Sequence, residues 1–191
     1  MFYFFINILG IFINIFIVKD NENLISERTN PGDNIKPWDK KILGLSLLIT
    51  IITYIIAGLD SGRFNWTKSY SYIYLIMGII ITIVGQLTFL IAKNQNKFFS
   101  SVARIQTDRN HEVCNIGLYK IVRHPGYLGM IISWIGFPLI LGSFFSIIPV
   151  FISIILIIIR TFLEDNMLEE ELNNYRDYKQ NVKYRLIPII W

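Results

Sequence analysis

Residues 127–159 read YLGMIISWIGFPLILGSFFSIIPVFISIILIII, a run of 33 residues without a single charge. As one helix this run would be about 50 Å long at roughly 1.5 Å per residue, whereas a bilayer core is only about 30 Å thick. Gly142 and Ser143 stand near its middle and indicate a turn. The run therefore predicts a hairpin of two membrane spans, residues 127–141 and 144–163, with a re-entrant pair as the alternative.

Three further uncharged runs precede the hairpin, at residues 2–18, 42–59 and 70–92. Each is close to the roughly 20 apolar residues that a helix needs to cross a bilayer. The first run could be a signal peptide, but it lacks a basic n-region and a small-residue cleavage site, and Lys19-Asp20 follow it, so we interpret it as a span. We therefore predict an all-α, polytopic membrane bundle of about five spans.

The distribution of charge predicts the topology. The chain has 191 residues, of which 53% are hydrophobic and 17% charged, against about 25% charged in soluble domains. Lys and Arg number five in residues 19–41, two in 60–69, six in 93–123 and four after Asp165. Since basic loops favour the cytoplasmic side, the first, third and fourth of these segments should face the cytoplasm. Topology and anionic lipid explain nearly all of the basic residues, so no nucleic-acid partner is indicated.

The chain divides into two parts on this basis. Residues 1–92 form a three-span scaffold with almost nothing ionisable in its spans, and residues 93–191 form the region that carries the chemistry. The loop that opens the second part is long for a connection, which is typical of a functional or a disordered segment. Apolar residues recur at helical spacing from Met167 to Tyr175. This predicts an amphipathic cytoplasmic helix that continues from the last span until Pro188.

Arg123-His124-Pro125-Gly126-Tyr127 stands where the cytoplasmic loop enters the hairpin. One interpretation is a boundary signal, with Arg at the interface, Pro in the first helical turn and Tyr in the aromatic belt. The other is a binding site, because a helix N-terminus presents free N–H groups to a carboxylate or a phosphate.

Arg160 follows the 16 uncharged residues 144–159 of the second arm and lies one turn inside the last span, where an ionisable group is usually functional. Glu164 falls on the same helix face, four residues on, and Asp165 is next. The alternative is an interfacial Arg–Glu pair with Arg160 snorkelling outward. The acid run at residues 169–171 is interpreted as a solvated helix face.

The segment from His111 through Cys114 to Gly117 and Tyr119 leads into the first motif. Gly117 permits a turn, and Tyr119 offers an aromatic face for a base or ring. Cys114 is the only cysteine, which excludes an internal disulfide and a CxxC metal site. In isolation Cys114 would be a small buried hydrophobe and His111 a loop residue.

Together these segments resemble a known family. Gly-x-Tyr-x-x-x-Arg-His-Pro-x-Tyr-x-Gly at residues 117–129, Arg-x-x-x-Glu-acid-x-x-Leu at 160–168, and Tyr-x-x-Tyr with Arg-Leu-Ile-Pro within 175–188 are similar to the isoprenylcysteine carboxyl methyltransferases. That family is related to the phospholipid N-methyltransferases. The resemblance covers residues 111–191.

The resemblance implies an integral membrane methyltransferase that uses S-adenosylmethionine in a cytoplasm-facing pocket. Its acceptor would be a lipophilic or prenylated molecule, or a phospholipid amine. The cofactor-binding residues carried over are His111, Glu112, Val113, Cys114, Tyr119, His124, Pro125, Gly126, Tyr127 and Glu164. Arg160 is carried over as the catalytic, substrate-binding residue that faces the acceptor. Asp165 replaces a family Glu, so Glu164 is given more weight, and Arg104 is not placed. The membrane would be the inner membrane in a bacterium or the endoplasmic reticulum in a eukaryote.

The chemistry of the residues agrees with this expectation. Glu164 can accept from ribose hydroxyls or an amine, while His124 and free N–H groups can hold a carboxylate. Methyl transfer is an in-line displacement that needs no metal and no covalent intermediate. Arg160, with its planar fork of donors, could clamp a carboxylate acceptor through two hydrogen bonds.

Two other functions remain open at this point. Membrane sterol reductases share the His-Pro-x-Tyr element, but the residue two after the Tyr is usually acidic in them, and here it is Gly129. A non-catalytic membrane protein is the other alternative. The intact motif set argues against it, and the few charges within the spans show no ion path.

Overall fold

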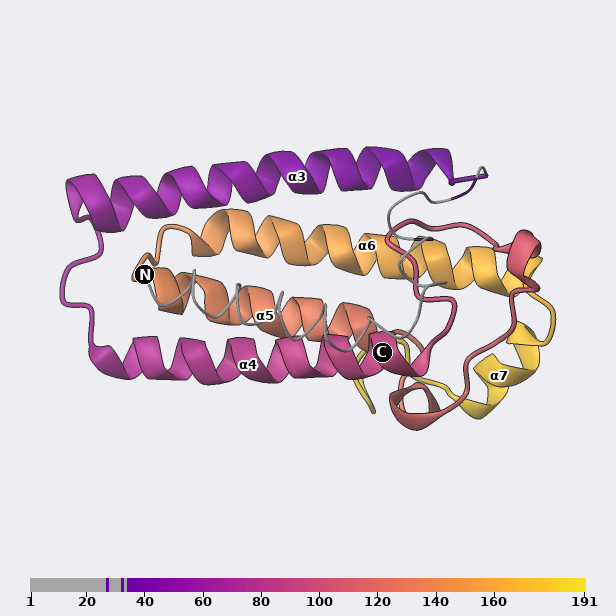
Figure 1. Ribbon diagram of the computed structural model, residues 1–191. Helices are drawn as coiled ribbons and strands as arrows, with labels where there is room; N and C mark the ends of the chain where they lie inside the picture. Colours follow the sequence, from indigo (N-terminus) through magenta and orange to yellow (C-terminus); the bar gives the residue numbers. More distant parts are fainter. Residues whose placement is uncertain (1–26, 28–31, 33) are drawn as a thin grey trace.

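The computed structural model describes residues 27, 32 and 34–191. The described part contains helices and turns but no strand. Its four long helices run side by side (Figure 1), and each packs on the next in the order α3, α6, α5, α4. Their bounds are α3 Pro37–Ala57, α4 Tyr72–Gln95, α5 Pro125–Leu141 and α6 Ile147–Glu171.

The predicted all-α membrane bundle is confirmed. Among the described residues, three helices are long and apolar enough to cross a membrane, namely α4, α6, and α3 with its π-helical continuation Gly58–Phe64. The fourth, α5, is apolar but has only 17 residues. The span predicted at residues 2–18 lies outside the described residues. Length and composition thus make the chain an integral membrane protein.

The predicted break in the last apolar run is confirmed at Gly142, where φ is 65°. Glycine reaches this left-handed conformation without steric cost. The second arm begins at Ile147, three residues later than predicted, because the residues between form a turn. In that turn Ser146 N–H donates to Ser143 Oγ at 3.2 Å, and Ser146 Oγ donates to the Ser143 carbonyl at 2.7 Å. With 25 residues, α6 is about 37 Å long and can cross a bilayer core.

Two helix boundaries differ from those predicted. α3 begins at Pro37 instead of residue 42, which places Asp39 in its first turn. The tail is helical, but the single continuous helix was wrong: α6 ends at Glu171, and a separate short helix, α7 (Tyr175–Asn181), follows. Asn174 adopts a left-handed conformation, with φ 63°, which interrupts the helical hydrogen bonds and turns the chain.

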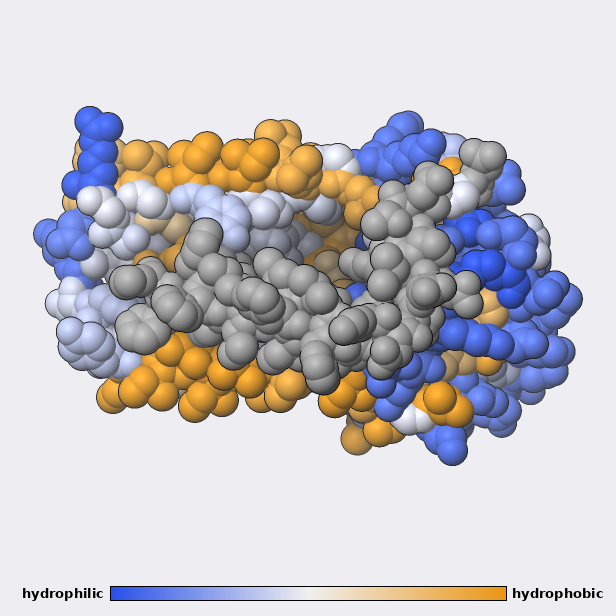
Figure 2. All heavy atoms as spheres, in the orientation of Figure 1, coloured by the Kyte–Doolittle hydropathy of each residue, from blue (hydrophilic) through white to orange (hydrophobic). Residues whose placement is uncertain are grey.

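The loop between α4 and α5 is folded against α7 at one end of the bundle. It contains two short 3₁₀ turns, Thr107–Arg109 and Gly117–Lys120. Figure 2 shows this end as hydrophilic, while the visible stems of α3 and α4 are hydrophobic. The buried side chains of Arg104 and Gln106 come from the same loop. The loop is therefore a folded part of the protein, and it lies at the boundary between the apolar stems and the polar end.

Four glycines bring α4 and α5 into backbone contact. Gly78 and Gly85 of α4 face Gly136 and Gly129 of α5. A Cβ added to Gly85 would lie 2.5 Å from the backbone nitrogen of Ser133, and one added to Gly136 would lie 2.7 Å from the carbonyl oxygen of Gly78. Small residues allow membrane helices to approach this closely.

We expect Gly85→Ala to destabilise the protein by about 1–3 kcal/mol, the range for overpacking a tight core. The control is Gly44→Ala in α3, where an added Cβ meets no described atom within 4 Å. The control gains the same helix propensity, about 1 kcal/mol, without the clash. Unfolding in detergent measured by circular dichroism tests this, and equal stabilities of the two variants would contradict the close packing.

Candidate active site at the polar end of the bundle

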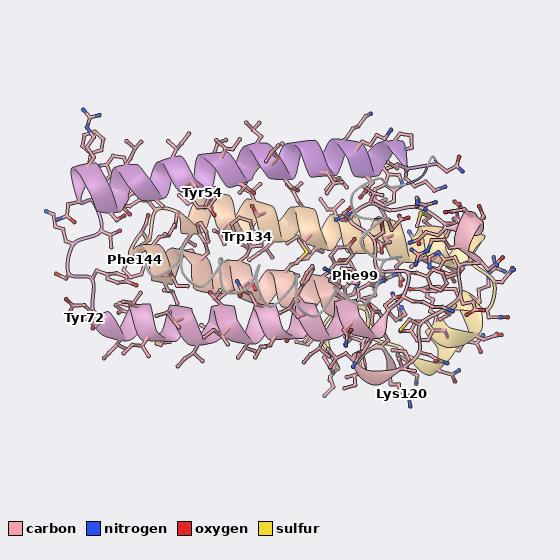
Figure 3. All side chains as sticks on the ribbon, viewed as in Figure 1. Tyr54, Tyr72, Phe99, Lys120, Trp134 and Phe144 are labelled. Carbon is pink, nitrogen blue, oxygen red and sulfur yellow. The ribbon has the colours of Figure 1, made fainter. Side chains whose placement is uncertain are left out.

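A cavity of about 300 Å³ lies where the apolar stems meet the polar end. Figure 3 shows nitrogen- and oxygen-bearing side chains gathered at this end, beyond the labelled Phe99. The volume falls at the lower end of the roughly 300–1,000 Å³ range of small-molecule sites. Leu43 of α3, Phe89 of α4 and Met130 of α5 form its apolar side. The rest of the wall mixes charged side chains, among them Arg160 and Glu164, with apolar and aromatic ones such as Phe98, Val113 and Met167.

The cavity brings most of the sequence-predicted site residues together. The predicted residues that line it are His111, Glu112, Val113, Cys114, Tyr119, His124, Gly126, Tyr127, Arg160 and Glu164. Pro125 does not line it; this residue is fully buried at the start of α5. Residues that stand far apart in the sequence thus share one wall, and their binding roles remain predictions.

Asp165 is fully buried, and its carboxylate is the centre of a hydrogen-bond network. Arg123 donates from Nε to Oδ1 at 2.8 Å and from Nη2 to Oδ2 at 2.9 Å. The Tyr175 hydroxyl and Arg185 Nε also donate to it, each at 2.8 Å, and His124 Nε2 lies 3.1 Å from Oδ1. One carboxylate therefore joins the entry to α5, α6, α7 and the C-terminal segment.

This network limits what His124 can do. Its Nε2 is engaged with Asp165, and its backbone N–H donates to the Arg185 carbonyl at 2.9 Å. The first turn of α5 also contributes Gly126 and Tyr127 to the wall. Their N–H groups have no intrahelical acceptor, because they belong to the first turn. These backbone groups, rather than the His124 ring, are therefore suited to hold an anion.

Tyr127 contacts both Arg160 and Glu164 of α6. Its hydroxyl donates to Glu164 Oε2, and the Arg160 guanidinium lies 5.3 Å from the centre of its ring. The His124 ring lies nearly parallel to the Tyr127 ring at 5.8 Å. Glu164 thus contacts the hydroxyl of this ring and Arg160 lies over its face, and both residues line the same cavity.

Arg160 pairs with Asp39 and not with Glu164. Its Nε donates to Asp39 Oδ1 at 2.7 Å, and its Nη2 donates to Oδ2 at 3.2 Å. Nη2 also donates to the Ser101 carbonyl at 2.9 Å, and Asp39 accepts the Ala103 N–H at 2.8 Å. The i, i+4 spacing suggested the wrong partner, because Asp39 lies on a different helix, 121 residues away in the sequence.

The segment that begins at His111 forms the wall toward solvent. The Gln106 N–H donates to His111 Nδ1 at 3.3 Å, and the imidazole ring packs on the Phe98 ring at a tilt of 37°, with 4.6 Å between their centres. Burial, reinforced by Arg104 and Arg109, lowers the pKa of His111 to about 4. Glu112 is largely exposed and forms a surface ion pair with Lys97 at 2.9 Å, although part of it lines the cavity.

Cys114 and Tyr119 lie deeper in the wall. Burial raises the pKa of the Cys114 thiol, whose Sγ lies 3.4 Å from the Gln95 carbonyl oxygen. Tyr119 is buried, and its carbonyl accepts the Tyr178 hydroxyl at 2.7 Å. Both side chains are uncharged at neutral pH, so this part of the wall is suited to an aromatic or apolar group.

Arg104, to which the sequence motifs assigned no role, lines the cavity and forms ion pairs with two carboxylates. Its guanidinium contacts Glu27 through Nε at 2.9 Å and through Nη2 at 2.6 Å, and it contacts Asp108 through Nη1 at 2.8 Å. Ser100 Oγ donates to the same Glu27 at 2.9 Å. This cluster closes the cavity on the side of residues 98–108 and leaves Arg104 without a free charge.

The residue that sequence reasoning missed most clearly is Asp39. It stands in a Trp-Asp-Lys-Lys sequence before an apolar run, which is typical of a solvated helix start. The only signal was its position three residues before an uncharged run, because the helix dipole stabilises an acidic side chain near the start of a helix. Arg123 and Arg185 belonged to the motifs, but their shared carboxylate was not recognised.

The fold and the cavity define a class: a polytopic helical membrane protein with a cavity at the polar ends of its helices. Residues 32–182 match the family model described as "Protein of unknown function (DUF1295)". The chain therefore belongs to this family, which contains isoprenylcysteine methyltransferase-like members. The resemblance stated from the motifs is confirmed.

Two curated relatives agree with this family. Both are named "Probable protein-S-isoprenylcysteine O-methyltransferase", one from Oryza sativa subsp. indica and one from subsp. japonica. Each is 33% identical to the chain over 89 residues, which cover 40% of this chain and 45% of the relative. The match thus spans less than half the length of these relatives.

We expect Asp165→Asn to destabilise the protein by about 3–5 kcal/mol, because it leaves the buried Arg123 without a counter-charge. The matched control is Asp177→Asn in α7, which is exposed and should change stability by less than about 1 kcal/mol. Thermal unfolding in detergent compares the two. Similar unfolding temperatures would show that the network does not hold the polar end together.

The lowered pKa of His111 predicts that the protein loses stability in mild acid. In the unfolded chain the imidazole takes a proton near pH 6.5, whereas in the fold its pKa is about 4. The unfolded state therefore binds more protons between these values, and stability falls as pH falls. From pH 6.5 to pH 5 the loss should be at most about 2 kcal/mol. His111→Gln should remove this part of the pH dependence in chemical unfolding, and an unchanged profile would contradict it.

Proposed function

We propose that this chain is an integral membrane methyltransferase that transfers a methyl group from S-adenosylmethionine to a lipid-like or prenylated acceptor. The observation that carries the proposal is that the motif residues shared with methyltransferases line a single cavity. The names of the two relatives support the same activity. The resemblance to the phospholipid N-methyltransferases gives an alternative acceptor, a phospholipid amine.

The residues of the wall fit this cofactor. The carboxylate of Glu164 can accept from ribose hydroxyls or from an ammonium group, and the first-turn N–H groups of Gly126 and Tyr127 can receive a carboxylate. Phe98 and Tyr119 offer aromatic faces for the adenine ring. When bound, the cofactor supplies a methyl group activated by a positively charged sulfur.

The rest of the chemistry consists of orientation and exclusion of water. Holding two reactants in line contributes about 7–11 kcal/mol in well-aligned systems. Leu43, Phe89 and Met130 make the membrane side of the cavity apolar, so a hydrocarbon tail can reach the site while water is excluded. The wall combines residues from both predicted parts of the chain, since Leu43 and Phe89 precede residue 93.

The membrane and its orientation follow from the same proposal. The wall of the cavity includes basic-loop residues that positive charge assigns to the cytoplasm, where the cofactor is available. The membrane would be the inner membrane of a bacterium or the endoplasmic reticulum of a eukaryote. Displacement at the methyl carbon of a sulfonium requires no metal.

The experiment uses purified protein in nanodiscs with methyl-labelled S-adenosylmethionine, a lipid extract and a prenylcysteine analogue. We expect label to appear in a lipophilic product. Glu164→Ala should weaken cofactor binding at least tenfold, about 1.4 kcal/mol, because it removes a charged hydrogen-bond acceptor.

The control for this variant is Glu170→Ala, which changes the same residue type at an exposed position of α6. Calorimetric titration should show that Glu170→Ala binds S-adenosylmethionine with almost the same affinity as the wild type. Equal losses at both positions would count against the assigned pocket, and a wild-type protein without cofactor affinity would overturn the proposed function.

A further inference from the structure

Three arginines line the cavity, and each already has a carboxylate partner. Arg104 contacts Glu27 and Asp108, Arg123 contacts Asp165, and Arg160 contacts Asp39. These are all the Arg and Lys side chains of the described wall. The cavity therefore offers no uncompensated positive charge from its described residues.

The donors of Arg160 are also largely used. A guanidinium has five N–H groups, and three of them are engaged: Nε–H with Asp39, and the two of Nη2 with Asp39 and the Ser101 carbonyl. Only the two on Nη1 have no partner among the described residues. A fork of parallel hydrogen bonds to an arriving carboxylate needs two neighbouring nitrogens, so Arg160 is not free to form one.

A carboxylate acceptor would meet two costs here. It would have to displace Asp39 from Arg160, and Asp39 is fully buried, so the displaced charge would be left without its counter-ion. Glu164 adds a further formal negative charge one turn away on α6. An uncharged nucleophile meets neither cost. A polar atom of the acceptor next to the nucleophile can still accept a hydrogen bond from Arg160 Nη1.

We propose that Asp39 is a positioning and specificity residue of the methyl-transfer site: it fixes Arg160 and cancels its charge, so that the site selects an uncharged nucleophile over a carboxylate. A lipid amine in its free-base form is the acceptor class that this favours. The inference rests on the proposed methyltransferase function. In the reaction the nitrogen lone pair forms the new N–C bond, the C–S bond breaks, its electron pair stays on sulfur, and the product ammonium releases a proton to water.

The test compares two acceptors with the same 18-carbon chain, one ending in a primary amine and one in a carboxylate. Purified full-length protein in nanodiscs receives methyl-labelled S-adenosylmethionine, and kcat/KM is measured for each acceptor. For the wild type we expect the amine to be preferred at least tenfold. A preference for the carboxylate would overturn the inference.

Variants of the ion pair test the role of Asp39 itself. Asp39→Asn keeps the size of the side chain but releases the charge of Arg160, so the preference should shift toward the carboxylate at least tenfold, mainly through KM. Asp39→Glu keeps the charge and should stay within about threefold of the wild-type ratio. The double variant Asp39→Asn, Arg160→Gln should lose the gain, because the released cation is gone.

The outcomes separate this inference from the proposed function. An unchanged ratio in Asp39→Asn overturns the role of Asp39, while the methyltransferase activity stands. If the wild type binds S-adenosylmethionine but methylates neither acceptor, the acceptor class is wrong. If it does not bind the cofactor, the proposed function itself fails. Should Asp39→Asn not fold, the wild-type ratio together with Asp39→Glu still decides the case.

Discussion

Charge that leaves water must be paired, and this requirement organises the polar end of the protein. An isolated buried ion costs several kcal/mol even after the surroundings relax. Asp165 meets the requirement with Arg123 and Arg185, and in doing so it draws the C-terminal segment back to the entry of α5. Asp39 meets it with Arg160 and joins α3 to α6. The cavity exists between these pairs because each pair fixes two elements that are distant in sequence.

Most of the fold could be predicted from the sequence because the bilayer imposes a length on uncharged runs. The turn at Gly142 was visible for the same reason, since one helix could not contain the whole run. Helix ends were less predictable. The start of α6 depends on the hydrogen bonds between Ser143 and Ser146, and the break before α7 depends on the backbone of Asn174. Neither leaves a pattern in hydropathy.

The glycine contact between α4 and α5 could not be recognised from the sequence, although the glycine spacing is present in it. Gly78 and Gly85 are separated by seven residues, as are Gly129 and Gly136, so each pair falls on one helix face. The pattern becomes meaningful only when the two faces are known to meet. Close backbone approach then explains why these positions exclude a side chain.

The site shows the same division between local and distant information. The motif residues were found because each motif is short and lies near a helix end, and the cavity contains nearly all of them. The partner of Arg160 was missed because it lies 121 residues away in a segment that resembles a solvated helix start. Asp165 was underestimated for a similar reason: its role depends on Arg123, Tyr175 and Arg185, which converge only in the folded chain.

The ion pair between Arg160 and Asp39 joins α3 to α6, and in the proposed methyltransferase it would also set the specificity of the site. An arginine one turn inside a membrane span needs a counter-charge, and Asp39 supplies it from the first turn of α3. The same contact removes the free charge that a carboxylate acceptor would require. A site that kept Arg160 unpaired would bind an anion more readily, but the bundle would then bury an uncompensated cation. Because the fold resolves this conflict in favour of the internal pair, we propose that the group that meets the methyl donor is one that brings no charge of its own.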